Sequence, residues 1–185
     1  MSLFKKQGFQ FFIFFGIFAL IAGIAHAEVS AETQYVFNTF LFLVCGFLVM
    51  FMAAGFAMLE AGSVRSKNAA AICVKNISLY STAGLLYWLV GYNLMYGVDE
   101  GGFLGSISVW TADDMAVGGE APDYSGGYAS GSDWYFQMVF CATTASIVSG
   151  TIAERLKIWP FLIFTLVLTG FIYPIVGSWE WGGGF

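Results

Sequence analysis

The residues best suited to do chemistry in this sequence are two aromatic rings spaced four apart. Phe136 and Phe140 would lie on one face of a helix, because residues four apart stack in successive turns. Ring faces attract small cations, and each such contact contributes about 0.5–2 kcal/mol. The alternative is that both rings face lipid or the protein core. The spacing alone leaves both interpretations open.

Catalytic and nucleotide chemistry have little support among the other residues. The sequence offers no nucleophile–base pair and no histidine–carboxylate set, and its single histidine is His26. Cys45, Cys73 and Cys141 lie in apolar segments without metal or disulfide spacing. No glycine-rich run leads into the Lys-Ser or Lys-Thr of a phosphate-binding loop. We therefore expect neither an enzyme nor a metal or cofactor site, and the net charge of −5 argues against nucleic acid as a partner.

The aromatic pair must be positioned by helices that cross a membrane. The chain is 58% hydrophobic and only 10% charged, whereas soluble domains carry about 25% charged residues. A crossing helix needs roughly 20 mostly apolar residues. The predicted fold is an all-α polytopic membrane protein, and its four transmembrane helices cover residues 35–62, 69–96, 134–153 and 158–176.

Residues 1–27 have the pattern of a secretory signal peptide. Lys5 and Lys6 precede an apolar run, and Ala25-His26-Ala27 is a small-x-small cleavage site before Glu28. We expect cleavage at this site, although the length of the apolar run would also suit an uncleaved anchor. The mature chain, residues 28–185, would then begin outside the plasma (inner) membrane.

The distribution of charge agrees with this orientation. An outer start places four basic residues on the inner side, as the positive-inside rule requires; they are Arg65, Lys67, Arg155 and Lys157. Residues 98–132 then form an outer loop that is rich in glycine and acids and has no Lys or Arg. This loop could be a solvated spacer or an acidic lid that concentrates cations.

Two charged residues fall inside the predicted spans. Glu60 lies at the edge of the first span, where an acid is costly and often functional. It could instead offset the charge of the basic loop that follows. Lys75 lies about two turns into the second span and could extend its ammonium group to the same interface as Arg65 and Lys67.

Three motifs in this sequence resemble those of the ammonium transporter family (Amt/Mep/Rh). They occupy residues 54–68, residues 133–137 with Phe140 and the run to 153–155, and residues 173–184. Their order and spacing extend the similarity from the mature N-terminus to the last residue, and the acidic loop matches least. The resemblance implies a homotrimer of eleven-helix subunits, each with its own pore for ammonium or ammonia. The pore histidines of the family follow the Gly-Gly-Gly turn, so we expect this chain to be the N-terminal part of a transporter.

The same resemblance implies roles for three residues. Phe136 and Trp181 would form an outer ammonium-binding site by cation–π contact, and Phe140 would be the first half of a stacked phenylalanine gate in the pore. From physical reasoning alone, two of the tryptophans at positions 134, 179 and 181 would instead belong to an interfacial aromatic belt. The implied partners are ammonium or methylammonium, the lipid bilayer and a cytoplasmic PII-type regulator. The alternative function is an ammonium sensor that signals from the same fold.

Overall fold

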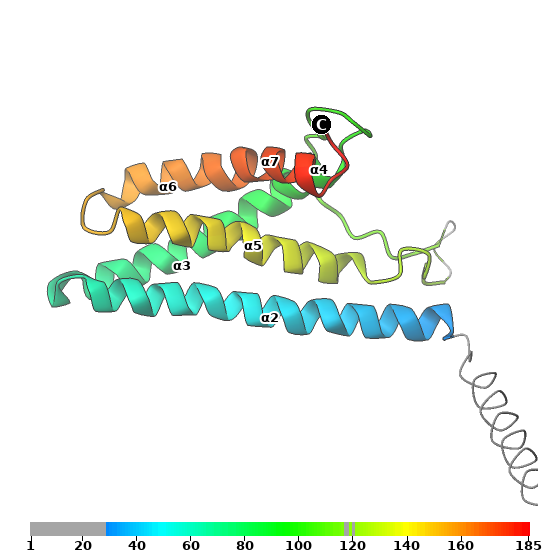
Figure 1. Cartoon of the computed structure of the whole chain (residues 1–185), viewed down its shortest axis with the longest axis horizontal. Coiled ribbons are helices and arrows are strands. Elements are labelled where there is room, and N and C mark those ends of the chain that lie inside the picture. Colours follow the sequence, from blue (N-terminus) through cyan, green and yellow to red (C-terminus); the bar gives the residue numbers. More distant parts are fainter. Residues whose placement is uncertain (1–28, 117–118, 120) are drawn as a thin grey trace, which may run out of the picture.

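The computed structural model describes residues 29–116, 119 and 121–185, and the predicted signal peptide at 1–27 lies outside them. Helices make up the regular structure of the described residues, which confirms the all-α expectation. The chain runs along the bundle in four antiparallel passes (Figure 1). The first pass is α2 (Ala31–Ser63), and a short 3-10 turn, η1 (Ser66–Asn68), leads into the second.

The other three passes include two π-helical segments. The second pass comprises α3 (Ala69–Leu86), the π-helical η2 (Tyr87–Gly91) and α4 (Tyr92–Tyr96). The third pass is α5 (Ser130–Thr151). The fourth comprises α6 (Ile158–Val167), the π-helical η3 (Leu168–Ile172) and α7 (Tyr173–Glu180).

Three passes within the described residues are long and apolar enough to cross a membrane: Ala31–Ser63, Ser66–Tyr96 and Ile158–Glu180. The third pass, α5, is not among them, although the sequence predicts a span there. Its hydroxyl-bearing residues Thr143, Ser146 and Ser149 are buried against other helices. Thr143 and Ser146 each donate a hydrogen bond to the carbonyl four residues earlier, so their hydroxyls need no water.

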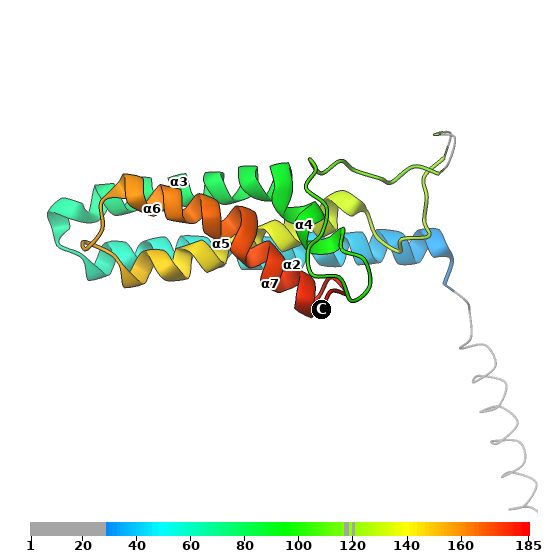
Figure 2. The same cartoon turned by 90° about the horizontal axis from the view of Figure 1, so that it is seen from above.

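The helices pack in two groups that share α3. The third pass, α5, packs mainly against α2 and α3, and the fourth pass lies along the second (Figure 2). One core cluster, with Tyr87, Met95 and Met138, fills the half of the bundle near α4. A second cluster, with Leu79 and Phe161, fills the half near the start of α6. The fourth pass therefore touches α5 much less than it touches the second pass.

Two π-helical segments meet where the second and fourth passes cross. Gly91 lies at this crossing, and a Cβ atom there would come within 2.7 Å of Tyr87 Cδ2 and 3.3 Å of the Thr169 carbonyl oxygen. Opposite it, a Cβ atom on Gly170 would come within 3.0 Å of Leu86 Cδ1. The two backbones can approach this closely because each segment carries a glycine at the contact.

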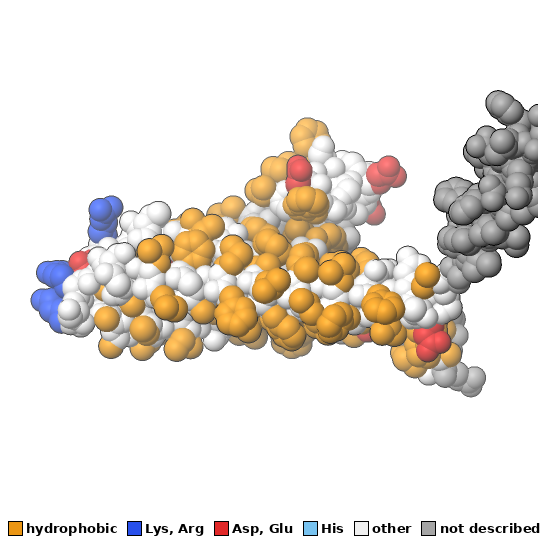
Figure 3. All heavy atoms as spheres, turned by 60° about the horizontal axis from the view of Figure 1, so that its bottom comes forward, with side chains coloured by type: hydrophobic (Ala, Val, Ile, Leu, Met, Phe, Trp, Pro, Cys, Tyr) orange, Lys and Arg blue, Asp and Glu red, His pale blue; other side chains and the backbone are white. Residues whose placement is uncertain are grey.

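The two ends of the bundle carry opposite charge, and apolar side chains cover the surface between them (Figure 3). We call one end the basic end; its loops, residues 64–68 and 152–157, carry Arg65, Lys67, Arg155 and Lys157. The other, the acidic end, includes the loop of residues 97–129 and its described acids Asp99, Glu100, Asp113, Asp114 and Asp123. The outward face of α2 exposes large apolar side chains along its length, including Phe37, Phe40, Phe47, Phe51 and Met58. This surface suits contact with lipid or another apolar partner.

Candidate functional site

The predicted aromatic pair is present on α5, and Phe136 lies nearly two turns after the start of this helix at Ser130. The rings of Phe136 and Phe140 meet edge to face, with their centroids 5.1 Å apart and an interplanar angle of 74°. Phe136 also meets Phe42 of α2 edge to face at 5.2 Å. Aromatic pairs in this geometry contribute about 0.5–1.5 kcal/mol beyond their buried area. The three rings form a continuous aromatic row between α2 and α5.

Contacts between α2 and α5 set the position of this row. The ring of Tyr135 packs directly on Gly46 of α2, where an added Cβ atom would lie 2.7 Å from Tyr135 Cε1. The residues just before α5 are also tied to α2. Asn38 Nδ2 donates to the Gly127 carbonyl at 2.9 Å, and the Ala129 N–H donates to Thr39 Oγ1 at 2.9 Å. The segment that leads into α5 is therefore fixed against α2 by hydrogen bonds, and Tyr135, the neighbour of Phe136, is fixed by packing.

Trp181, the third predicted site residue, lies at the C-terminal end of α7. Its backbone N–H donates to the Gly177 carbonyl at 2.8 Å, and the residue is 72% exposed. Among the described residues, no ring contact joins Trp181 to Phe136 or Phe140. The grouping of these three residues into one binding site therefore stays a prediction.

A second group of aromatic and acidic residues at the acidic end was not predicted from the sequence. Trp110 of the 97–129 loop stacks on Trp134 of α5, with centroids 5.3 Å apart, and packs edge to face on Tyr92 at 5.9 Å. Tyr92 donates a hydrogen bond to the buried carboxylate of Asp133 at 2.5 Å. The acidic loop is thus anchored on the helices and is not a purely solvated spacer. Only the long Gly- and Asp-rich composition was visible in the sequence, and it did not single out Trp110.

The basic end contains a buried charged cluster that joins α2, α3 and α5. Glu60 is 3% exposed and Lys75 is 8% exposed, and Lys75 Nζ lies 3.0 Å from Glu60 Oε2. Lys75 also donates to the Ser149 carbonyl at 3.0 Å. Ser149 Oγ and Asn76 Nδ2 donate to the same Glu60 oxygen at 2.9 and 3.3 Å. We call these residues, Glu60, Lys75, Asn76 and Ser149, the inner cluster.

The inner cluster excludes two of the placements that the sequence left open. Lys75 does not extend to the interface beside Arg65 and Lys67, because its ammonium group turns inward and pairs with Glu60. Glu60 does not offset the charge of the basic loop, because it is buried against α3 and α5. An unpaired ion is costly inside a membrane, so two helices that each carry one charge gain by bringing them together.

A different acid, Glu154, holds the loops of the basic end together. Its Oε1 accepts hydrogen bonds from the Arg65 N–H at 3.0 Å, from Arg65 Nε at 3.2 Å and from Asn68 Nδ2 at 2.5 Å. The bond from Asn68, followed by that from the Arg65 N–H, holds the pKa of the Glu154 carboxyl below its ordinary value. Glu154 has a φ of 63°, a backbone conformation that residues other than glycine rarely adopt.

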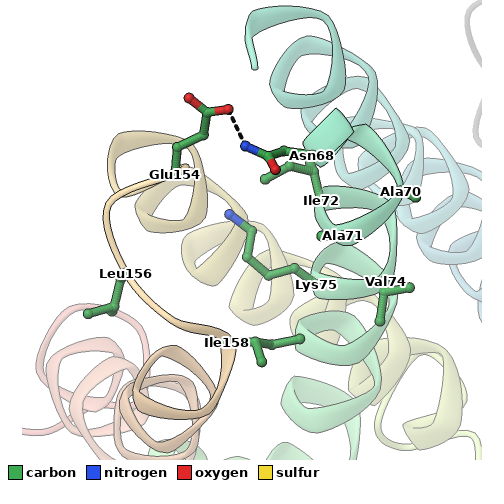
Figure 4. A pocket seen from close by; sticks show the side chains of 9 residues that line it. All are labelled: Asn68, Ala70, Ala71, Ile72, Val74, Lys75, Glu154, Leu156 and Ile158. Carbon is green, nitrogen blue, oxygen red and sulfur yellow. Dashed lines mark hydrogen bonds between the residues drawn. The ribbon is translucent and has the colours of Figure 1, made fainter. Parts of the chain in front are cut away.

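A cavity of about 500 Å³ opens beside this contact, between the start of α3 and the loop before α6 (Figure 4). Asn68 and Glu154 stand at one side of it, joined by their hydrogen bond, and the stem of Lys75 runs along another. Ile72 and Ile158 supply apolar walls. Most of the charge that lines the cavity is already paired, so the cavity has no strong preference for an ion of either sign.

Comparison with known proteins gives one consistent family. The model described as Ammonium Transporter Family matches residues 40–185. Ammonium transporter Amt2 of Archaeoglobus fulgidus is 46% identical over 143 residues, which cover 77% of this chain and 28% of the relative. A putative ammonium transporter of Synechocystis sp. is 40% identical over 172 residues, which cover 90% of this chain and 37% of the relative.

Solved structures give the same picture. A structure titled Sensor Amt Protein aligns with a TM-score of 0.71 and 33% identity, covering 83% of this chain and 36% of that one. Candida albicans Mep2 aligns with a TM-score of 0.63 at 22% identity, covering 84% of this chain and 34% of that one, and shows a shared fold. This chain therefore spans between 28% and 37% of the length of these relatives and structures.

Proposed function

We propose that this chain, which belongs to the ammonium transporter family, forms part of a membrane protein that moves ammonium or ammonia across the bilayer. The observation that carries the proposal is the family match over residues 40–185, which includes the aromatic row between α2 and α5. Transport requires a membrane-embedded bundle, and three of the four passes have the length and apolarity to cross a bilayer. The relatives are named as transporters, so we propose transport and not catalysis.

The proposed outer site uses Phe136 and Trp181, and Phe140 is the proposed gate. Electron-rich ring faces replace part of the hydration shell of ammonium, at about 0.5–2 kcal/mol for each contact. Binding of this strength is weak enough to let the ion leave again, as conduction requires. The edge-to-face contact between Phe136 and Phe140 on one helix supports this proposal, because a gate must adjoin the site that supplies it. Rotation of the Phe140 ring would then open the way past it.

The proposed orientation puts the acidic end outside and the basic end in the cytoplasm of the plasma (inner) membrane. Within the described residues, every Lys and Arg lies at the basic end: four are in its loops, and Lys75 is in the buried inner cluster. The positive-inside rule assigns such an end to the cytoplasm. The signal-peptide pattern at 1–27 supports the same orientation.

We further propose a homotrimer. The exposed apolar face of α2 offers a surface for contacts between subunits. A PII-type regulator would bind at the basic end if that end is cytoplasmic. This last partner rests on the family alone.

A second candidate function is ammonium sensing on the same fold. It is favoured by the alignment to the structure titled Sensor Amt Protein, the higher of the two TM-scores given above. A sensor would bind ammonium through the same aromatic residues and pass on a conformational change. The two functions differ in whether solute crosses the membrane.

Uptake of labelled methylammonium by cells that lack their own ammonium transport tests both functions. Cells that express the intact protein should accumulate the label, and Trp181→Leu should weaken uptake at low concentration. Trp159→Leu is the matched control, because Trp159 is 73% exposed but lies at the start of α6, at the other end of the bundle. Unchanged uptake in Trp181→Leu would remove the cation–π role of Trp181. Binding of ammonium without uptake by the unaltered protein would favour the sensor.

A further inference from the structure

The carboxylate of Glu60 is bonded very unevenly. Oε2 receives three donors: Lys75 Nζ, Ser149 Oγ and Asn76 Nδ2. Oε1 is buried, yet no group of the described residues donates to it. A buried acceptor without a donor is costly, and most so on an ionised group. A donor from outside this part of the chain would remove that cost.

Room for such a donor exists on the Oε1 side. Gly150 of α5 faces this oxygen, and a Cβ atom built on Gly150 would lie 3.9 Å from Oε1 and 3.7 Å from Glu60 Cγ. Both residues line a cavity of about 810 Å³ between α2 and α5. Phe56 and Ile147 supply apolar walls, and Arg65 and Arg155 lie toward the basic end. Oε1 itself is covered, but because Gly150 has no side chain, a small shift of the Glu60 carboxylate would bring Oε1 into contact with this cavity.

The charge of the cluster selects a neutral donor. The ammonium of Lys75, 3.0 Å from Oε2, already balances the carboxylate of Glu60. A second cation would leave an uncompensated positive charge in a buried site, which is strongly unfavourable. A neutral molecule with N–H or O–H groups satisfies Oε1 without changing the net charge. Asn76 Oδ1, which also lacks a donor among the described residues, adds a second acceptor to the cluster.

We propose that Glu60 Oε1 accepts a hydrogen bond from a small neutral molecule, water or ammonia, held in the cavity beside Gly150. This site belongs to the basic end and is separate from the aromatic row between α2 and α5. Occupation by water is independent of the proposed transport function, whereas occupation by ammonia rests on it. The molecule completes the hydrogen bonding of the inner cluster, to which α2, α3 and α5 all contribute.

An experimental structure of the intact protein, at a resolution that shows ordered water, tests the site. Density should appear within about 2.5–3.2 Å of Oε1. Crystals or grids prepared with and without an ammonium salt identify the occupant. Density under both conditions means water, and density that requires ammonium means ammonia. No density at Oε1 under either condition overturns the proposal, whether or not the protein transports methylammonium.

Two further measurements keep the test independent of any single variant. Gly150→Ala should abolish the density, because the added methyl group fits at van der Waals distance but takes up space beside Oε1. Gly55→Ala is the matched control, since a Cβ atom there meets nothing within 4 Å. Unchanged density in Gly150→Ala would refute the placement. The infrared difference spectrum between the unaltered protein and Glu60→Gln should show carboxylate bands; a protonated-carboxyl band would make Oε1 a donor itself and also overturn the proposal.

Discussion

The hydroxyl of Tyr92 donates a 2.5 Å hydrogen bond to Asp133 Oδ2 and so joins the end of the second pass to the start of the third. Asp133 is 6% exposed, and its other oxygen accepts a hydrogen bond from Gln137 Nε2 at 3.2 Å. Trp110 packs on Tyr92 from the acidic loop. Tyr92 therefore links the second pass to the acidic loop and to the first turn of α5, where Asp133 lies three residues before Phe136.

Tyr92→Phe should lower the free energy of unfolding by about 1.5–3 kcal/mol, because it removes a hydrogen bond to a buried carboxylate and keeps the ring. Thermal unfolding in detergent measures the change. Tyr96→Phe is the control, since the Tyr96 ring packs on Tyr92 at 5.1 Å and its hydroxyl makes no hydrogen bond within the described residues. An equal effect of both variants would show that the hydrogen bond from Tyr92 to Asp133 does not stabilise the fold.

Lys75→Met should be among the most damaging single substitutions in the helices. It leaves the Glu60 carboxylate buried without its counter-ion, and breaking a buried pair in this way costs about 3–5 kcal/mol. The double variant Glu60→Gln/Lys75→Met should recover much of that loss, because no unpaired charge remains. Equilibrium unfolding of the single and double variants provides the comparison. Lys67→Met, at an exposed position, should change stability by no more than about 0.5 kcal/mol.

Glu154 should make stability fall in acid. Its folded-state pKa lies below the ordinary value of 4.5, so its contribution is fully present above that pH and is lost as pH falls through the folded pKa. The melting temperature of the unaltered protein should therefore decline below about pH 4.5. Glu154→Gln should flatten this decline.

The control for Glu154 is Glu180→Gln, which removes an acid at the other end of the bundle that forms no ion pair within the described residues. Asp123 also has a lowered pKa, caused mainly by the Ser125 N–H, and leaves some acid dependence in either variant. A decline of the same steepness in Glu154→Gln and in the unaltered protein would contradict the role assigned to Glu154.

Gly91→Ala should destabilise the crossing of the second and fourth passes. The added methyl group would lie 2.7 Å from Tyr87 Cδ2 and 3.2 Å from Pro174 Cγ, and overpacking of this kind costs about 1–3 kcal/mol. Gly62→Ala is the matched control. It lies in the last turn of α2 with nothing within 4 Å, so alanine there should be neutral or stabilising by up to about 1 kcal/mol. Unfolding midpoints of both variants decide the question.

Sequence reasoning was strongest where apolar composition alone carries the signal. A helix overlaps each of the four ranges predicted as spans, because long apolar runs in this chain have no stable alternative in a bilayer. It was weaker at the start of α5. The predicted range begins at residue 134, whereas the helix begins at Ser130 and includes the polar residues Ser132 and Asp133. Hydrophobicity alone does not predict that Asp133 is buried and hydrogen-bonded within the bundle.

The inner cluster and the Trp110 stack escaped prediction for a different reason. Glu60 and Lys75 were both singled out from the sequence, but spacing along the chain does not say which faces of two helices meet. Ser149, 89 residues from Glu60, carries no signal of its own. Trp110 lies in a loop without periodicity, so its stacking on Trp134 depends on tertiary contacts alone. The edge-to-face pair of Phe136 and Phe140, by contrast, follows from helical spacing within one element.

The π-helical segments change the phase of everything that follows them. Successive residues of an α-helix are rotated by about 100° about the helix axis, and a π-helical turn contains one residue more than an α-helical turn. Directions counted along α6 therefore slip by about one residue's step after Leu168–Ile172. The direction in which Trp181 leaves the end of α7 therefore depends on this π-helical segment, and it does not follow from the apolar face of α6.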